Sequence, residues 1–144
     1  MKAIRPLLSL FTGVAIVAGA RAAGNSSVLI PRYERVAAAL VADNLADAKS
    51  AAQALAAVAG NDHHDTIAGA ARAIARAADL GAAREAFKTL SARVIVLARH
   101  EKGYFIINCP MADADWLQST RKIANPYFGQ AMSGCGLVTE ETTG

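Results

Sequence analysis

A helical repeat of apolar residues over residues 79–102 constrains the fold of this chain more than any other feature. Apolar side chains recur there every three or four positions, the spacing that places them on one face of a helix. They are Leu80, Ala83, Phe87, Leu90, Val94 and Leu97. The charged side chains of Arg84, Glu85, Lys88 and Arg93 fall off this face. We therefore expect a helix that starts at Asp79 and ends near residues 99–102, before Gly103.

Three earlier segments carry the same spacing and are rich in alanine: residues 31–41, 43–59 and 65–78. Pro31 is acceptable in the first turn of a helix, where its missing N–H costs nothing, so we expect the first helix to begin there. Residues 24–28 then form a short flexible lead-in. Helix-capping residues stand at the start of the other two segments, namely Asp43 or Asn44 and Asp65 or Thr66.

Four helices joined by short connections predict a mainly α fold, an up-down-up-down four-helix bundle over residues 28–102. Alanine lets helices approach closely and has the highest helix propensity, so local and tertiary preferences agree. An alternative stays open, in which the bundle is a pair of longer, kinked helices. The first two segments would then fuse through Asp43 and Asn44.

The first 22 residues have the pattern of a secretory signal peptide. Basic residues at the start, Lys2 and Arg5, precede an uncharged apolar run over residues 6–20 and small residues around the expected cleavage point after Ala22. The run is too short for a confident membrane span, although an uncleaved anchor is the alternative. We expect a secreted protein with one domain over residues 23–144 and no membrane span after cleavage.

The charge of the mature chain excludes one class of function. The whole sequence has 15 Lys and Arg against 12 Asp and Glu, and three of the basic residues, Lys2, Arg5 and Arg21, lie in the leader. Without the leader the two signs balance. A nucleic-acid partner requires a basic surplus that displaces counterions from phosphates, so we do not expect one.

Residues 103–144 follow a different pattern and form a predicted C-terminal cap. The run 104–109 is β-branched and aromatic, and a second strand-like run covers residues 135–139. Pairing of these two runs in a small β-hairpin brings Cys109 close to Cys135. Aromatic residues between them, at Trp116 and in the turn over residues 125–129, seat the cap on the bundle.

Both cysteines, and both methionines beyond the initiator, lie in this cap. They occur as Cys109-Pro110-Met111 and as Met132 followed by Cys135. Thiolates and thioethers are soft donors that favour Cu(I) or Ag(I), and a thioether binds without losing a proton and cannot form a disulfide. His100, at the end of the fourth helix, either complements the helix dipole as a cation or serves as an auxiliary ligand.

A structural disulfide explains the same two cysteines. Secreted proteins with two cysteines commonly join them, and closing this loop contributes about 3.5 kcal/mol on the chain-entropy model. Met111 and Met132 are then ordinary core residues. Both alternatives stay open, and they can alternate with redox state.

An ordered string of motifs resembles a known family. The string comprises Asp79-Leu80, Arg84, Phe87 and Leu90-Ser91, then Cys109-Pro110-Met111, Trp116-Leu117, Asn125-Pro126-Tyr127-Phe128-Gly129, and Met132 with Cys135-Gly136. It is similar to the periplasmic domain-of-unknown-function family 3347, whose members occur alone or attached to CusB-like copper and silver efflux adaptors. The connection over residues 111–116 is shorter than the family pattern and lacks the glycine before the tryptophan.

The resemblance implies a heavy-metal-associated helical domain. Cys109, Met111, Met132 and Cys135 are its candidate metal contacts, Cu(I) or Ag(I) its cargo, and a CusB-like adaptor or another periplasmic metal carrier its partner. We do not expect an enzyme, because the chain has no metalloprotease helix motif, nucleophile elbow or phosphate-binding glycine loop. The alternative is a helical interaction module with a disulfide between Cys109 and Cys135.

Overall fold

The computed structural model describes residues 23–144, so the predicted signal peptide over residues 1–22 lies outside the described residues. The described part contains no helix with the length and apolar character needed to cross a membrane. It comprises four α-helices, three β-strands and one short 3-10 helix, η1. Their bounds are α1 Ala23–Val41, α2 Leu45–Asn61, α3 Asp65–Ala75, α4 Leu80–Ala98, β1 Lys102–Cys109, β2 Ala114–Gln118, η1 Gly129–Ala131 and β3 Leu137–Thr143.

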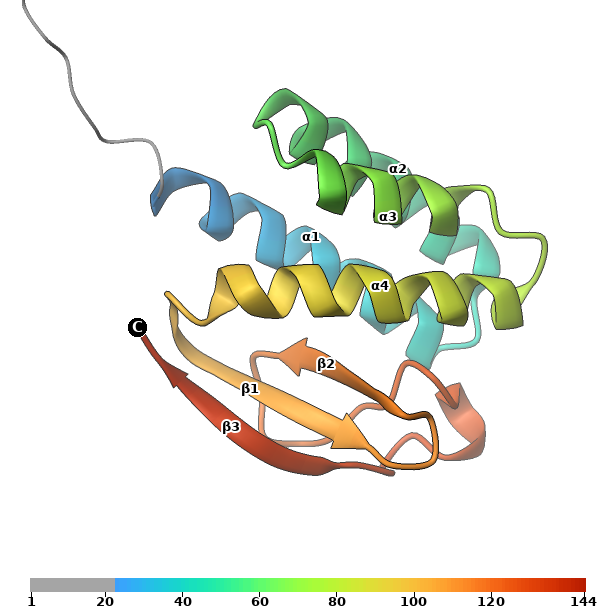
Figure 1. Cartoon of the computed structure of the whole chain (residues 1–144). Helices are drawn as coiled ribbons and strands as arrows, with labels where there is room; N and C mark the ends of the chain where they lie inside the picture. Colours follow the sequence, from blue (N-terminus) through green and yellow to red (C-terminus); the bar gives the residue numbers. More distant parts are fainter. Residues whose placement is uncertain (1–22) are drawn as a thin grey trace, which may run out of the picture.

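The predicted mainly α class is confirmed, and a small antiparallel sheet follows the helices (Figure 1). Helices adjacent in sequence pack against one another, and α4 also contacts α1 and β2. This position makes α4 the element that joins the helices to the sheet. The up-down-up-down arrangement of the bundle stays a prediction.

The predicted starts of α2 and α4 are confirmed by their caps. Asn44 accepts a hydrogen bond from the Asp47 backbone N–H at 3.0 Å, and Asp79 accepts one from the Ala82 N–H at 2.8 Å. Each cap satisfies an N–H group that has no partner within its helix. The predicted apolar face of α4 is buried at its centre, where Ala83, Phe87, Leu90 and Val94 have no exposed area.

The first helix begins earlier than predicted. It starts at Ala23, so residues 24–28 are helical and the expected flexible lead-in is wrong. Pro31 lies inside the helix, where it removes one backbone hydrogen bond at a cost of about 3 kcal/mol. Complete burial of Leu29, Ile30 and Tyr33 around the proline outweighs that cost.

The alternative of a fused first helix is also wrong. α1 ends at Val41 and α2 begins at Leu45, and Asp43 between them has a positive φ of 56° that no helix continues through. The third helix ends at Ala75, three residues before its predicted end, because Arg76 leaves the helix as its C-cap.

The sheet has the order β2-β1-β3, with β1 antiparallel to both neighbours. The expected pairing of residues 104–109 with the C-terminal run is present, since Ile107 faces Val138 and Asn108 faces Leu137. On its other side β1 pairs with β2, a segment predicted only to supply aromatic contacts, and there Ile107 faces Trp116. The expected two-stranded hairpin is therefore a three-stranded sheet.

Aromatic side chains connect the helices to the sheet. Tyr33 of α1 stacks on Phe87 of α4 with ring centroids 5.1 Å apart. Phe87 contacts Tyr127 at 5.8 Å, and Tyr127 meets the edge of Trp116 in β2 at 6.0 Å. Such contacts add about 0.5–1.5 kcal/mol per pair beyond the area that they bury. The predicted role of the aromatic turn over residues 125–129, seating the C-terminal segment on the helices, is present.

Candidate functional site

The two cysteines lie together at one end of the sheet. Cys109 is the last residue of β1 and is buried, whereas Cys135 lies two residues before β3 and is half-buried. Their Sγ atoms are 3.8 Å apart, and both thiols are free. The sequence-based expectation that Cys109 and Cys135 approach each other is therefore met.

The distance between the sulfurs is that of a hydrogen bond between two thiols and is too long for a disulfide. A disulfide requires an S–S distance of about 2.05 Å. Two thiolates that each bind one ion at about 2.3 Å lie about 3.8 Å apart at a tetrahedral angle. The separation of 3.8 Å in this protein equals the second value. The two thiols are therefore unbonded and in hydrogen-bond contact, and a disulfide requires them to approach.

The surroundings make the two thiols chemically unequal. Burial works to raise the pKa of Cys109, but hydrogen bonds from the Ala112 backbone, the Asn125 side chain, Cys135 and the Met111 backbone outweigh it, and the pKa lies below its usual value. The pKa of Cys135 is raised, first because its thiol hydrogen-bonds Cys109 and then because of burial. Of the two thiols, Cys109 therefore has the lower pKa and Cys135 the higher.

The two methionines are close to the cysteines in the sequence, and both are exposed. Met111 follows Cys109 by two residues and is 65% exposed, and Met132 precedes Cys135 by three residues and is 37% exposed. Neither side chain belongs to the core, so their alternative role as core residues is wrong. Leu137 and Val138, at the start of β3, are exposed as well. Both thioethers are thus open to solvent, two and three residues from a cysteine in the sequence.

His100 is not brought to the sulfurs. It follows α4, two residues before β1 begins, whereas Cys109 ends β1, and the eight residues of this strand extend over roughly 23 Å. His100 instead lines a separate pocket of about 360 Å³ together with His64 and Arg93. A ligand set that contains both His100 and the cysteines is not assembled in one place.

The described residues, 23–144, contain no cluster of three or more His, Cys, Asp or Glu side chains able to hold a metal ion. The side chains with sulfur donors that the structure brings together are Cys109 and Cys135. Sulfur is a soft donor.

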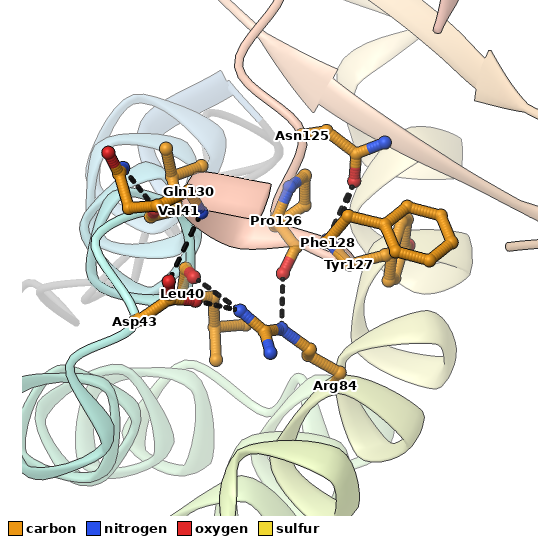
Figure 2. A network of polar contacts seen from close by, with 9 residues as sticks. All are labelled: Leu40, Val41, Asp43, Arg84, Asn125, Pro126, Tyr127, Phe128 and Gln130. Carbon is orange, nitrogen blue, oxygen red and sulfur yellow. Dashed lines mark hydrogen bonds and ion pairs between the residues drawn. The ribbon is translucent and has the colours of Figure 1, made fainter. Parts of the chain in front are cut away.

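A polar network centred on Arg84 holds the segment that leads to Cys135 (Figure 2). The Arg84 Nε donates to the Pro126 carbonyl at 2.9 Å, and Nη2 donates to the Leu40 carbonyl at 3.0 Å and to Asp43 Oδ1 at 2.5 Å. Gln130 adds a backbone hydrogen bond to Asp43 Oδ2 at 3.2 Å. The network ties α4 to the α1–α2 connection and to the 125–130 turn.

Asn125 continues this network to the cysteines. Its Oδ1 accepts hydrogen bonds from the backbone N–H groups of Tyr127 at 2.8 Å and Phe128 at 3.2 Å. Its Nδ2 donates to the Cys135 carbonyl at 2.7 Å, and its own N–H donates to the Ser133 carbonyl at 2.7 Å. Sequence reasoning placed Asn125 in a turn and Arg84 off the apolar face, and missed both as supports of the site. Arg84 and Asn125 both belong to the ordered string of motifs in the sequence, and this was the signal that could have identified them.

The fold and the site define a helical domain with a small antiparallel sheet that presents two free thiols at one end. The model of a family of proteins of unknown function, DUF3347, matches residues 29–103, which is just over half of the chain. The protein therefore belongs to the DUF3347 family. The match covers most of α1, all of α2 to α4 and the first residues of β1, and it ends before Cys109. No curated protein and no solved structure matches the chain.

Proposed function

We propose that this protein binds Cu(I) or Ag(I) in the periplasm and holds the ion or delivers it to an efflux system. The thiols of Cys109 and Cys135 are the primary ligands, and the thioethers of Met111 and Met132 complete the site. The scaffold is an up-down-up-down bundle followed by a C-terminal segment that contains these residues, with Cys109 at the end of β1. The observation that supports this proposal is the pair of unbonded thiols 3.8 Å apart.

The chemistry of the donors selects the class of ion. Thiolate and thioether sulfur favour soft ions, and a shift of Cys109 toward the thiolate provides a ready anionic ligand. Tetrahedral zinc sites use four strong nitrogen, sulfur or oxygen ligands, and this location offers two thiols and weakly basic thioethers. We therefore expect the protein to bind Cu(I) much more tightly than Zn(II).

Exposure of the site supports delivery of the ion to a partner. The half-buried Cys135 and the exposed side chains of Met111, Met132 and Leu137 are open to direct contact with another protein. A CusB-like efflux adaptor or another periplasmic metal carrier with soft ligands of its own is the partner that suits this chemistry. Ligands would then be exchanged at the surface without unfolding of either protein.

The double variant Met111→Leu/Met132→Leu tests the thioethers. Leucine preserves volume and apolar character, so the fold and both thiols should remain, at a cost under about 1.5 kcal/mol. Competition with a chromogenic chelator under reducing conditions should show at least a tenfold loss of Cu(I) affinity and no comparable loss for Zn(II). Leu137→Val, which changes an exposed side chain without sulfur, is the matched control and should bind Cu(I) normally. Unchanged Cu(I) affinity in the double variant would exclude the thioethers as ligands.

A structural disulfide remains the second candidate, because two thiols at 3.8 Å need only a small movement to bond. The protein would then be an interaction module without metal. Thiol titration of the mature protein, purified from the periplasm without reductant, separates the two. Two reactive thiols per chain support the metal site, and none supports the disulfide.

A further inference from the structure

Asn125 contacts the surroundings of both cysteines, although it belongs to neither cysteine segment. Its side chain has no exposed area. One amide N–H group donates to the Cys135 carbonyl at 2.7 Å, and the same side chain lowers the pKa of the Cys109 thiol. The main-chain N–H of the same residue donates to the Ser133 carbonyl at 2.7 Å. A single buried residue thus joins the turn over residues 125–129 to the loop that carries Cys135.

These contacts exceed what the turn requires. The turn itself uses only Oδ1, which accepts from the N–H groups of Tyr127 and Phe128. The amide nitrogen is directed instead to the segment that carries Cys135. Its anchor is firm, because the neighbouring Pro126 carbonyl accepts a hydrogen bond from Arg84 of α4 at 2.9 Å. Movement of the Cys135 backbone toward Cys109 would have to break or lengthen the hydrogen bond from Asn125 Nδ2 to the Cys135 carbonyl.

We propose that Asn125 is the positioning residue that keeps the two thiols apart at a metal-bridging separation and stabilises their reduced form. The role of Asn125 in metal binding rests on the proposed function, whereas its role in stabilising the reduced thiols does not. Oxidation must bring the sulfurs from 3.8 Å to about 2.05 Å. It also removes the Cys109 thiolate, whose formation the Asn125 side chain favours.

The redox step is a thiol–disulfide exchange with a defined oxidant. Oxidised dithiothreitol accepts two electrons and two protons from Cys109 and Cys135, its own S–S bond breaks, and one S–S bond forms in the protein. Any group that stabilises the dithiol shifts this equilibrium toward the reduced protein. Removal of the Asn125 amide should therefore make the protein easier to oxidise.

Two variants test the amide nitrogen. Asn125→Asp keeps the oxygen that accepts from Tyr127 and Phe128, so it preserves the turn while it replaces the amide donor. Asn125→Ala removes both functions without adding charge. Equilibration with mixtures of reduced and oxidised dithiothreitol, followed by acid quench and thiol labelling, gives the equilibrium constant. Both variants should favour the disulfide at least tenfold more than the original protein, a shift of about 30 mV.

Two control variants distinguish positioning of the thiols by Asn125 from a general loss of stability. Tyr127→Phe removes a hydrogen bond of 2.6 Å to the Asp115 carbonyl from the same turn and leaves Asn125 intact. Asn108→Ala removes an asparagine next to Cys109 whose amide instead bonds Asp115 at 2.8 Å. Both should have the redox equilibrium of the original protein even where they lower its melting temperature. Equal equilibrium constants in all variants would overturn the role of Asn125.

The Cu(I) arm distinguishes failure of this inference from failure of the proposed function. With thiols kept reduced, Asn125→Asp and Asn125→Ala should bind Cu(I) at least tenfold more weakly than Tyr127→Phe. If the original protein binds no Cu(I), the proposed function fails, and the shift in the dithiothreitol equilibrium still decides the role of Asn125. A shift in the dithiothreitol equilibrium with unchanged Cu(I) affinity would overturn only the role of Asn125 in metal binding.

Discussion

Gly129 lies directly against the carboxylate of Asp43. It has a positive φ of 55°, and a β-carbon at this position would overlap Asp43 Oδ1 and Arg84 Nη2. The glycine therefore meets two requirements, a left-handed backbone and a close approach of the 125–130 turn to the ion pair. The approach lets the neighbouring Gln130 N–H donate to Asp43 Oδ2 at 3.2 Å.

Gly129→Ala should destabilise the protein by at least about 2 kcal/mol, because an alanine adds left-handed strain and a clash with the ion pair. Urea unfolding followed by circular dichroism measures the loss. Gly134→Ala is the matched control, since a β-carbon there meets nothing within 4 Å. It should change the free energy of unfolding by less than about 0.5 kcal/mol. Equal effects of the two substitutions would contradict the packing at Gly129.

Local signals predicted the elements that depend on them. Asp79 and the apolar spacing after it define α4 within the helix itself, and the β-branched run before Cys109 defines β1 in the same way. The start of α1 was mispredicted because the local signal of Pro31 is overridden by burial of residues that contact distant parts of the chain. Local patterns contain no information on that burial.

The supports of the site depend on partners that sequence patterns do not reveal. Arg84 was predicted to lie off the apolar face, yet it binds two backbone carbonyls more than 40 residues away. Asn125 likewise binds carbonyls of Ser133 and Cys135. Every residue has a backbone carbonyl, so the spacing and type of residues cannot identify which carbonyls are bound. Proximity of Cys109 and Cys135 was predictable because it follows from strand pairing.

The Asp43–Arg84 ion pair should make stability depend on acid pH. Hydrogen bonds from Arg84 and from the Gln130 backbone hold the pKa of Asp43 below its ordinary value of 3.8. Because the folded pKa is lower than the unfolded one, the stabilisation is complete above the unfolded pKa and is lost as the pH falls through the folded pKa. Urea unfolding of the original protein and of Asp43→Asn should give a stability difference that is constant above about pH 5 and shrinks toward about pH 2. A difference that stays constant over this range would rule out the linkage.

Tyr33→Phe should cost about 1–3 kcal/mol of stability, because it leaves buried polar groups without a partner. The Tyr33 hydroxyl pairs with Ser91 Oγ at 2.8 Å and accepts from the Leu117 N–H at 3.2 Å. Ser91→Ala removes only the first of these and should cost less. Thermal unfolding of the two variants and of the double variant gives the coupling between them, and purely additive effects would mean that the two hydroxyls do not interact.

Gly69→Ala should stabilise the protein by about 0.5–1 kcal/mol. Gly69 lies in the interior of α3 on its exposed side, and a β-carbon there meets nothing within 4 Å. Alanine thus lowers the entropy of the unfolded chain without a clash in the folded one. The melting temperature should rise, and a fall would show that the space at this position is not free.

The unequal thiols give a reciprocal prediction for single-cysteine variants. In Cys135→Ala, Cys109 loses one of the hydrogen bonds that lower its pKa, while those from the Ala112 backbone and Asn125 remain, so its pKa should rise modestly. In Cys109→Ala, Cys135 loses the contact that is the largest cause of its raised pKa, so its pKa should fall toward the ordinary value of about 8.5. Ultraviolet absorbance of the thiolate during pH titration measures each variant separately and avoids the coupled titration of the pair. If the two pKa values shift in the same direction, the contact between the thiols does not lower the pKa of Cys109 while raising that of Cys135.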